Sequence, residues 1–250
     1  MYIEARLNQL LCSSDIDSPD YILASYFLNE AITQTKLTLQ AIQNSTYISI
    51  STINRFIKTG GFSSLKEFQR TLRDEKNAWD ASRSGYREIT VDELNDYSRS
   101  LTELSGRIRQ AAGIISSCKR VFVYGNYYSI IYFIPFFKDL QRRGISYFIL
   151  NDWKFSSIEK KILSMTEEDC FLFIEPEMPL SSIMLRSELM PGVVSCSAIS
   201  RCAGNKIYIC RDSEAALDNI TIISLSGYNN DELPHYIIHS VSEMMRAALT

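Results

Sequence analysis

Apolar residues change their spacing part-way along the chain. Up to about residue 116 they recur every three or four positions, which is the period of amphipathic helices. Ser18 and Pro19 mark one helix start, because serine can cap a first turn and proline fits into it. The helices predicted in this part cover residues 1–11, 19–29, 38–44, 50–59, 64–76 and 90–116.

From Arg120 onward, short apolar runs alternate with helical segments. The runs predict buried strands at residues 121–124, 145–150, 169–174, 206–210 and 220–225. The helices between and after them are expected at residues 129–143, 156–165, 193–203 and 231–249. Strands that alternate with helices favour a parallel sheet with helices on both faces. Such a doubly wound fold binds its ligands beyond the carboxyl ends of the strands.

A change in composition separates the two patterns. Residues 77–86 contain little that could form a core and include a run of serine, arginine and glycine at positions 82–85. We therefore predict an all-α domain at residues 1–76 and a linker at residues 77–89. An α/β domain that begins with a long helix is expected at residues 90–250.

The stretch at residues 45–68 contains the most informative helix. Its apolar face has i, i+3 and i+4 spacing and consists of Ile53, Phe56 and Ile57. Ser49 is placed to cap the first turn, and Gly60 lies just past the last turn, where a positive φ suits glycine. The opposite face is polar and carries Ser51, Asn54, Arg55 and Lys58.

A polar face of this kind suits the recognition helix of a DNA-binding helix-turn-helix. Arginine and asparagine can form paired hydrogen bonds with guanine and adenine edges, and hydroxyls can hold phosphates. Residues 38–44 predict the first helix, and a tight turn at residues 45–48 separates it from the second. A surface helix that is polar on its outer side would show the same pattern.

The candidate DNA-binding residues are Ser49, Ser51, Thr52, Asn54, Arg55, Lys58 and Lys66. Of these, Ser51, Asn54 and Arg55 are expected to read bases, and the two lysines to hold phosphates. The formal net charge of −3 indicates no global attraction to nucleic acid. Residues 50–76 nevertheless carry six basic and three acidic side chains, a local excess of +3. A solvated charged surface would account for so small an excess equally well.

The same stretch resembles the N-terminal domain of RpiR-family transcriptional regulators. Residues 48–56 match a pattern that runs roughly V-S-x-x-T-V-x-R-F, and residues 61–68 match its continuation with Gly-Phe and Lys-Glu-Phe. The chain departs from the pattern at two positions. Tyr47 stands where the family has a turn glycine, and Gly60 stands where the family has leucine. The tyrosine suggests a different turn geometry.

The second half resembles the sugar isomerase (SIS) domain that follows the helix-turn-helix in these regulators. The resemblance rests on the order of the elements and on the entry at residues 119–125. In that family two loops, roughly G-x-G-S-S and S-x-S-G-x-T, hold the phosphate of a sugar phosphate. The resemblance implies an N-terminal all-α helix-turn-helix domain and a C-terminal doubly wound α/β SIS-like domain with a five-stranded parallel sheet.

Both phosphate loops are altered in this chain. In the first loop Tyr127 and Tyr128 replace a glycine and a serine, and in the second the serines, the glycine and the threonine are gone. Two glutamates in the second loop would repel a phosphate. The candidate ligand-binding residues are Gly125, Ser129, Glu175 and Glu177. The changes oppose sugar-phosphate binding and leave open an uncharged or cationic ligand, a domain that only dimerises, or an acidic turn without a role.

The sequence offers little support for catalysis or metal binding. His235 and His239 have the i, i+4 spacing of metal ligands, but no carboxylate or cysteine accompanies them in a recognisable pattern. The six cysteines include no C-x-x-C pair and are expected to be free thiols in a reducing compartment. We therefore predict no enzyme activity, no metal and no cofactor.

These patterns predict a cytoplasmic transcriptional regulator that binds double-stranded operator DNA as a homodimer. Residues 1–11 lack a signal-peptide pattern, and no apolar run is long enough to span a membrane. The α/β domain is expected to serve dimerisation and the sensing of a small-molecule effector. One alternative is a sugar-phosphate isomerase or another SIS-domain enzyme, which would need intact phosphate loops. A protein-interaction module without DNA binding is the second alternative.

Overall fold

The strands of the second half form one parallel sheet, as the sequence predicts. The computed structural model describes residues 3–31, 37–83, 90–176, 196–211, 220–225 and 234–249. Its five strands are β1 (Arg120–Gly125), β2 (Ser146–Ile149), β3 (Asp169–Glu175), β4 (Asn205–Cys210) and β5 (Ile220–Ser224). All neighbours are parallel, and the strand order is β2-β1-β3-β4-β5.

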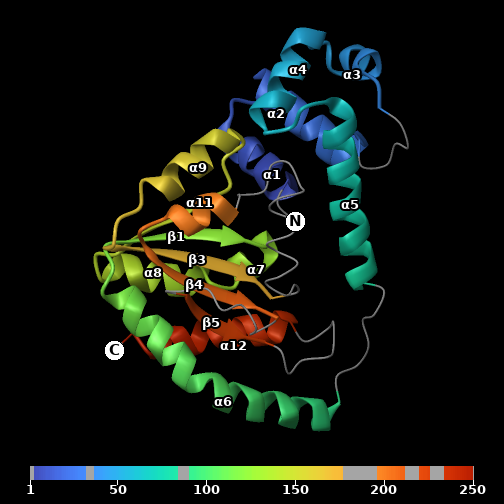
Figure 1. Cartoon of the computed structure of the whole chain (residues 1–250). Helices are drawn as coiled ribbons and strands as arrows, with labels where there is room; N and C mark the ends of the chain where they lie inside the picture. The colour runs from blue at the N-terminus through green and yellow to red at the C-terminus, as the bar shows by residue number, and fades with distance from the viewer. Residues whose placement is uncertain are drawn as a thin grey trace.

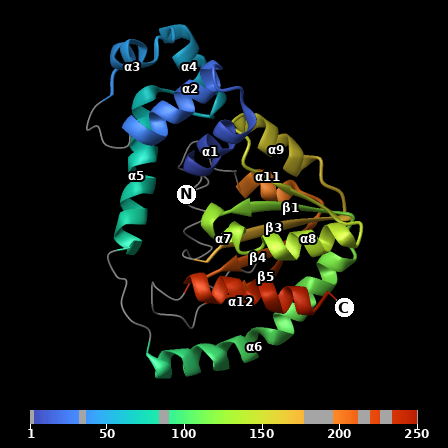
Figure 2. The ribbon, with the colours of Figure 1, turned by 180° about the vertical axis from the view of Figure 1, so that it is seen from behind.

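Helices cover both faces of this sheet (Figures 1 and 2). One face carries α9 (Phe155–Leu163) and α11 (Cys196–Arg201). The other face carries α6 (Val91–Ser116), α8 (Ile134–Arg142) and α12 (Pro234–Ala247). This arrangement confirms the mixed α/β fold with a five-stranded parallel sheet.

The two faces of the sheet differ in chemistry. Toward α6, α8 and α12 the strands present aliphatic side chains, among them Val121, Val123 and Leu172. Toward α9 and α11 they present the aromatic side chains of Phe122, Tyr124, Phe171, Phe173 and Tyr208. Every residue of β3 is buried. A central strand that is covered on both faces therefore reads as a continuous apolar run, which is how the sequence reveals it.

One helix expected at residues 129–143 is divided in two. A short helix, α7 (Tyr127–Ile131), is followed by a turn and then by α8, which contains Pro135 in its first turn. Proline has no backbone N–H and cannot continue a preceding helix without a break. The prediction of a single helix was therefore wrong, and Pro135 is the physical reason.

The first half of the chain folds into helices around an aromatic core. The helices are α1 (Ile3–Ser13), α2 (Pro19–Tyr26), a short π-helical turn η1 (Phe27–Ala31), α3 (Leu39–Thr46), α4 (Ile50–Thr59) and α5 (Leu65–Arg83). Phe27 stacks on Phe56 and meets Phe68 edge-on, with ring centroids 5.9 Å and 4.7 Å apart. The two figures show α1 between the other N-terminal helices and the sheet.

The end of α5 differs from the prediction, and the packing of α6 is resolved by the structure. The helix expected to end near residue 76 continues to Arg83, because the segment contains no glycine or proline before Gly85. Residues 84–89 of the expected linker lie outside the described residues. In α6 the apolar stripe packs on its own domain, since Ile108 and Ile115 are buried there and Tyr97 donates a hydrogen bond to the Ser240 hydroxyl on α12.

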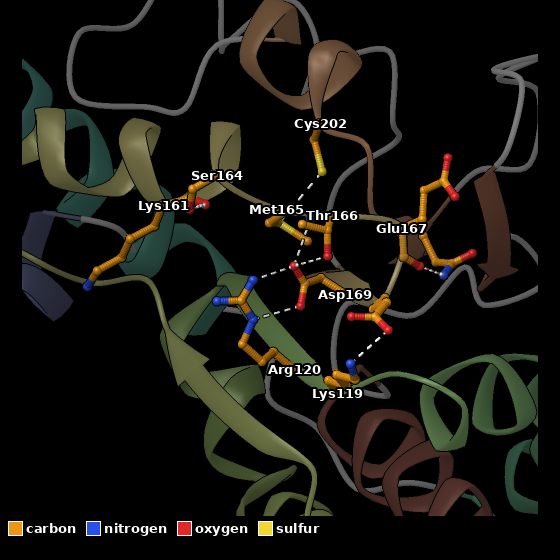
Figure 3. Close-up of polar contacts among 11 residues, drawn as sticks. Lys119, Arg120, Lys161, Ser164, Met165, Thr166, Glu167, Asp169 and Cys202 are labelled. Atoms are coloured by element: carbon orange, nitrogen blue, oxygen red, sulfur yellow. Dashed lines mark hydrogen bonds and ion pairs between the residues drawn. The ribbon is translucent and has the colours of Figure 1, made fainter.

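An ion pair joins the amino ends of β1 and β3 (Figure 3). Asp169 is 1% exposed and accepts two hydrogen bonds from Arg120, Nε to Oδ1 at 2.8 Å and Nη2 to Oδ2 at 2.7 Å. The Thr166 backbone N–H and hydroxyl also donate to Oδ2, at 2.7 Å and 3.1 Å. Burial opposes ionisation of Asp169, but the hydrogen bonds from Arg120 and Thr166 outweigh it and lower the pKa of this carboxyl.

We expect Asp169→Asn to lower the free energy of unfolding at pH 7 by about 2 kcal/mol, because charge-assisted hydrogen bonds are lost in a buried site. A depressed folded-state pKa stabilises the fold above the unfolded value, about pH 4, and the stabilisation is lost as pH falls through the folded value. Denaturant unfolding from pH 7 down to pH 2 should therefore show the two proteins converging in acid. A difference that stays constant over this range would contradict the assignment.

Candidate functional site

A three-residue turn joins α3 to α4 and presents Tyr47 to solvent. Thr38 caps α3 by accepting a hydrogen bond from the Ala41 backbone N–H. At the other end of α3, Tyr47 adopts φ 57° and ψ 18°, the left-handed conformation that favours glycine. The residue is 93% exposed. The tyrosine therefore occupies a backbone conformation that is unfavourable for a residue with a side chain.

We expect Tyr47→Gly to raise the free energy of unfolding by about 0.5–1 kcal/mol, since glycine relieves the left-handed strain but gains entropy in the unfolded chain. Tyr47→Ala is the matched control. It keeps a Cβ and the strain and removes only an exposed ring, so it should leave stability nearly unchanged. Thermal unfolding of the three proteins checks this. Destabilisation by glycine would show that the ring has a packing role.

The two faces of α4 are separated as the sequence predicts. Ile53, Phe56 and Ile57 are buried. Ser49 has extended backbone and caps the helix by accepting a hydrogen bond from the Thr52 backbone N–H at 3.3 Å. Its hydroxyl also lies 2.9 Å from that of Ser51 and 3.0 Å from that of Thr52. Hydroxyl groups therefore gather at the first turn of α4.

The remaining candidate DNA-binding residues share the outer side of this region. Ser51, Arg55 and Lys58 are exposed on α4, and Asn54 is half-buried beside them. Lys66 is exposed in the first turn of α5, which Ser64 caps. Within the described part of the chain, no ion pair engages the basic side chains of Arg55, Lys58 and Lys66. The structure thus gathers six of the seven residues on α4 and its cap and leaves their basic groups available.

The end of α4 differs from the prediction. Gly60 has φ −68°, and the positive φ of 92° falls on Gly61. Gly61 then permits the closing hydrogen bond from the Phe62 backbone N–H to the Ile57 carbonyl at 3.2 Å. Gly60 is required for a different reason, because a Cβ there would lie 2.6 Å from Cζ2 of Trp153.

The candidate ligand residues converge at the carboxyl ends of β1 and β3. These strands are adjacent, and the next described helices along the chain, α7 and α8 after β1 and α11 after β3, cover opposite faces of the sheet. Ligands of doubly wound folds bind at such a switch point. Gly125 is paired with Ile174 and has φ 143°. A Cβ at Gly125 would lie 2.1 Å from the Ile174 carbonyl oxygen, so close strand packing alone requires glycine here.

Three buried polar residues surround this switch point. Ser129 and Glu175 are each 2% exposed, and Asn126 is 5% exposed. The Asn126 backbone N–H donates to the Ile174 carbonyl at 2.8 Å. Asn126 was not identified from the sequence, although its place directly after a strand-ending glycine marks it as a loop residue at the ligand edge. Glu177 lies outside the described residues.

Trp153 belongs to the core of the N-terminal helices although it lies in the loop between β2 and α9. Its indole stacks on Phe56 of α4 with centroids 4.4 Å apart, and its Nε1 donates to the Phe56 carbonyl at 3.0 Å. No local pattern around residue 153 indicates this contact. The two halves of the chain therefore share a buried interface at the end of α4.

Arg6 of α1 completes this interface. Its side chain is buried, with Nε donating to the Asp152 carbonyl at 2.8 Å and Nη2 donating to the Gly60 carbonyl at 2.9 Å and to the Trp153 carbonyl. The guanidinium lies 5.1 Å from the Trp153 ring centroid. Burial lowers the pKa of Arg6 to about 10, and Tyr124, Glu75 and Asp152 oppose that shift, so the group stays charged at neutral pH.

Other classes of site find little support in the described residues. No group of three or more histidine, cysteine or acidic side chains is arranged to hold a metal ion there. No helix of the described segments is long and apolar enough to cross a membrane. Five cysteines in these segments are free thiols: Cys12, Cys118, Cys170, Cys202 and Cys210.

No protein-family model matches the chain, and no curated protein sequence matches it. Among solved structures, it is similar to the Vibrio vulnificus NanR protein complexed with ManNAc-6P, with 13% identity and a TM-score of 0.44 over 99% of this chain and 90% of that chain.

Two further structures are similar. The sugar isomerase domain of an RpiR transcription factor from Sphaerobacter thermophilus has 11% identity and a TM-score of 0.42, over 65% of this chain and 90% of that chain. The C-terminal domain of a glucosamine-fructose-6-phosphate aminotransferase from Francisella tularensis has 13% identity and a TM-score of 0.39, over 73% of this chain and 50% of that chain. At TM-scores this low, the likenesses do not by themselves assign a function.

Proposed function

We propose that the protein is a DNA-binding transcriptional regulator in which α3 and α4 form a helix-turn-helix and α4 is the recognition helix. The observation that carries the proposal is the separation of faces on α4. Its apolar side is fixed in a core by Ile53, Phe56 and Ile57, and its polar side is left to solvent. A recognition helix must be anchored in this way to present side chains to the major groove.

The chemistry of the outer side supports DNA as the ligand. Arg55 can form the paired hydrogen bonds that guanine accepts, and Asn54 those of adenine. Lys58 and Lys66 can contact phosphates on either side of the groove. The three basic groups stay unpaired within the described residues, so binding DNA need not break an existing ion pair.

We propose a homodimer as the binding form, with the α/β domain supplying dimerisation and effector sensing. Two recognition helices related by a two-fold axis read two half-sites of a palindrome. The altered phosphate loops, in which Tyr127 and Tyr128 replace a glycine and a serine, argue against a sugar-phosphate effector and leave an uncharged or cationic one. A DNA-binding regulator without catalytic activity also fits the absence of a recognisable acid/base pair in the sequence.

Selection of bound sequences from a random double-stranded DNA library tests the proposal. The full chain is used, and the enriched sequences are examined for symmetry. We expect a palindrome with two half-sites about one helical turn apart, or a multiple of it. Enrichment of no motif above the level of an unrelated acidic protein would reject DNA recognition and favour a protein-interaction module.

Phosphate contacts make a separate prediction about salt. The logarithm of the DNA association constant should fall linearly with the logarithm of salt concentration, and Lys58→Ala should make that slope less steep by about 2, because each subunit of the dimer loses one phosphate contact. Lys119→Ala is the matched control, because this exposed lysine pairs with Glu168 at the amino end of the sheet. Fluorescence anisotropy titrations at several salt concentrations check both variants. An unchanged slope for Lys58→Ala would remove this lysine from the DNA contacts.

A further inference from the structure

The end of α4 is held by groups from two distant parts of the chain. We call Arg6, Gly60 and Trp153 the α4 latch. The last carbonyls of a helix have no partner within the helix and need donors from elsewhere. In α4, the carbonyl of Gly60 accepts from Arg6, and the Phe56 carbonyl, which already accepts from the Gly60 backbone N–H, accepts a second hydrogen bond from the Trp153 indole. A guanidinium is also favourable beside the negative end of a helix dipole.

The latch also reaches the ligand edge of the sheet. Trp153 and Asp152 follow β2, and β2 is the direct neighbour of β1, which ends at Gly125. The Leu150 backbone N–H, at the start of the same loop, donates to the Val123 carbonyl of β1 at 2.8 Å. Asp152 is in turn held by Lys161 of α9 at 2.5 Å. The loop between β2 and α9, which contacts the end of α4, is therefore attached to β1 at its start and to α9 through Asp152.

Gly60 fits this contact and no larger residue does. Its φ of −68° is open to any amino acid, so its backbone conformation does not require glycine. The requirement comes from the indole of Trp153, whose Cζ2 would lie 2.6 Å from a Cβ. Arg55 and Lys58, on the polar face of α4, are exposed in the same structure in which the latch is formed.

We propose that Arg6 and Trp153 are positioning residues that set the orientation of α4 on the α/β domain. The proposal rests on the proposed function, since it assigns the latch a role in reading DNA. In a dimer joined through the α/β domains, a fixed α4 fixes the distance between the two recognition helices. The latch thereby selects one half-site spacing, and it lies where a ligand at the carboxyl edge of β1 could alter that spacing.

The packing of the latch is tested without DNA by combining Gly60→Ala with Trp153→Ala. In the native background, Gly60→Ala should lower Tm by about 5 °C because the methyl group collides with the indole. In the Trp153→Ala background it should raise Tm by about 2 °C, because alanine favours the helix over glycine. Gly113→Ala in α6 is the control, since nothing lies within 4 Å of its added Cβ. It should raise Tm equally in both backgrounds.

If Gly60→Ala changed Tm by the same amount in the native protein and in Trp153→Ala, the latch would not be formed in solution. Trp153→Ala removes a large buried ring, so Trp153→Phe serves as a milder variant. It keeps an aromatic ring near Phe56 but loses the indole donor to the Phe56 carbonyl. In that background the loss in Tm caused by Gly60→Ala should be reduced but not reversed.

The positioning role is tested by DNA selection with libraries in which two half-sites are separated by varied spacers. The native protein should bind one spacing about tenfold or more tightly than spacings two base pairs longer or shorter. At those spacings two fixed recognition helices cannot both make their full set of base contacts. Trp153→Phe and Gly60→Ala should reduce this preference to about twofold while keeping the same half-site. Phe171→Ala, which truncates a buried ring in the α/β domain, should destabilise the fold and keep the spacing preference.

The outcomes separate the two proposals. The Tm values can show that the effect of Gly60→Ala depends on Trp153 while the latch variants keep the native spacing preference. That result would overturn the positioning role and leave the latch as a structural contact. If the native protein selects no DNA at all, the proposed function fails, and the positioning role in DNA reading fails with it. The unfolding cycle then still decides whether the latch joins the two domains.

Discussion

Arg6→Ala is expected to lower the free energy of unfolding by about 3 kcal/mol, a loss of about 6–12 °C in Tm for a chain of this size. Three backbone carbonyls lose the Arg6 donor at once, those of Gly60 and Trp153 in buried positions and that of Asp152 in a partly buried one. An unpaired buried acceptor costs more than the net contribution of an ordinary hydrogen bond. The side chain also fills the space beside the Trp153 ring, so truncation leaves a cavity.

Two variants separate these causes. Arg6→Met keeps most of the volume but donates no hydrogen bond, so it should remain about 2 kcal/mol less stable than the native protein. Arg99→Ala is the control for loss of charge, because this exposed arginine pairs with an exposed Asp96, and it should change stability by less than about 0.5 kcal/mol. Denaturant unfolding measures all three. Arg6→Ala as stable as Arg99→Ala would mean that the guanidinium is not buried in solution.

Arg55→Ala is expected to weaken binding to the selected palindrome by about 30-fold or more while leaving the fold intact. A good bidentate contact to a base contributes about 1–3 kcal/mol of discrimination, and a dimer loses two such contacts. Arg55 is exposed, so its truncation should change the free energy of unfolding by no more than about 0.5 kcal/mol. Affinity for the palindrome and for a scrambled duplex, measured by anisotropy, distinguishes lost base reading from lost charge.

Arg109→Ala provides the comparison. Arg109 is an exposed arginine of α6, so its substitution removes the same charge far from α4. It should affect both duplexes by about twofold or less. Full affinity of Arg55→Ala for the palindrome would remove this residue from the recognition surface. A similar loss on both duplexes would make Arg55 a phosphate contact.

Several elements could be read from the chain because their signals are local. The cap at Ser49, the apolar face of α4 and the buried runs of β1 and β3 each depend on residues a few positions apart. Periodicity and capping act over that range. The division of α7 from α8 was missed although Pro135 stood in the sequence, because a proline can sit in a first turn as well as end a helix.

Gly60 shows where local reasoning fails. The sequence predicts a positive φ at Gly60, just past the last turn of α4. In the structure the positive φ belongs to Gly61. What requires glycine at Gly60 is the indole of Trp153, which comes from a distant part of the chain. The departure from the leucine of the regulator pattern at this position thus acquires a physical reason only when Trp153 is seen beside it. In the same way, Gly125 matches a phosphate-loop glycine, yet its contact with Ile174 already requires the absence of a side chain.

The sequence was sufficient for the helical first half, the parallel sheet of the second, and the polar face of α4, because hydrophobic spacing is set by the geometry of each element. The tertiary structure alone decided how the halves meet. Arg6 donates hydrogen bonds to Gly60, 54 positions along the chain, and to Trp153, 147 positions along the chain. Trp153 donates to Phe56, 97 positions away. Such contacts depend on the shapes of distant surfaces and on carbonyl groups that come within reach of a side-chain donor only once the helices and strands are packed. The same packing brought Asn126, Ser129 and Glu175 to one buried edge of the sheet.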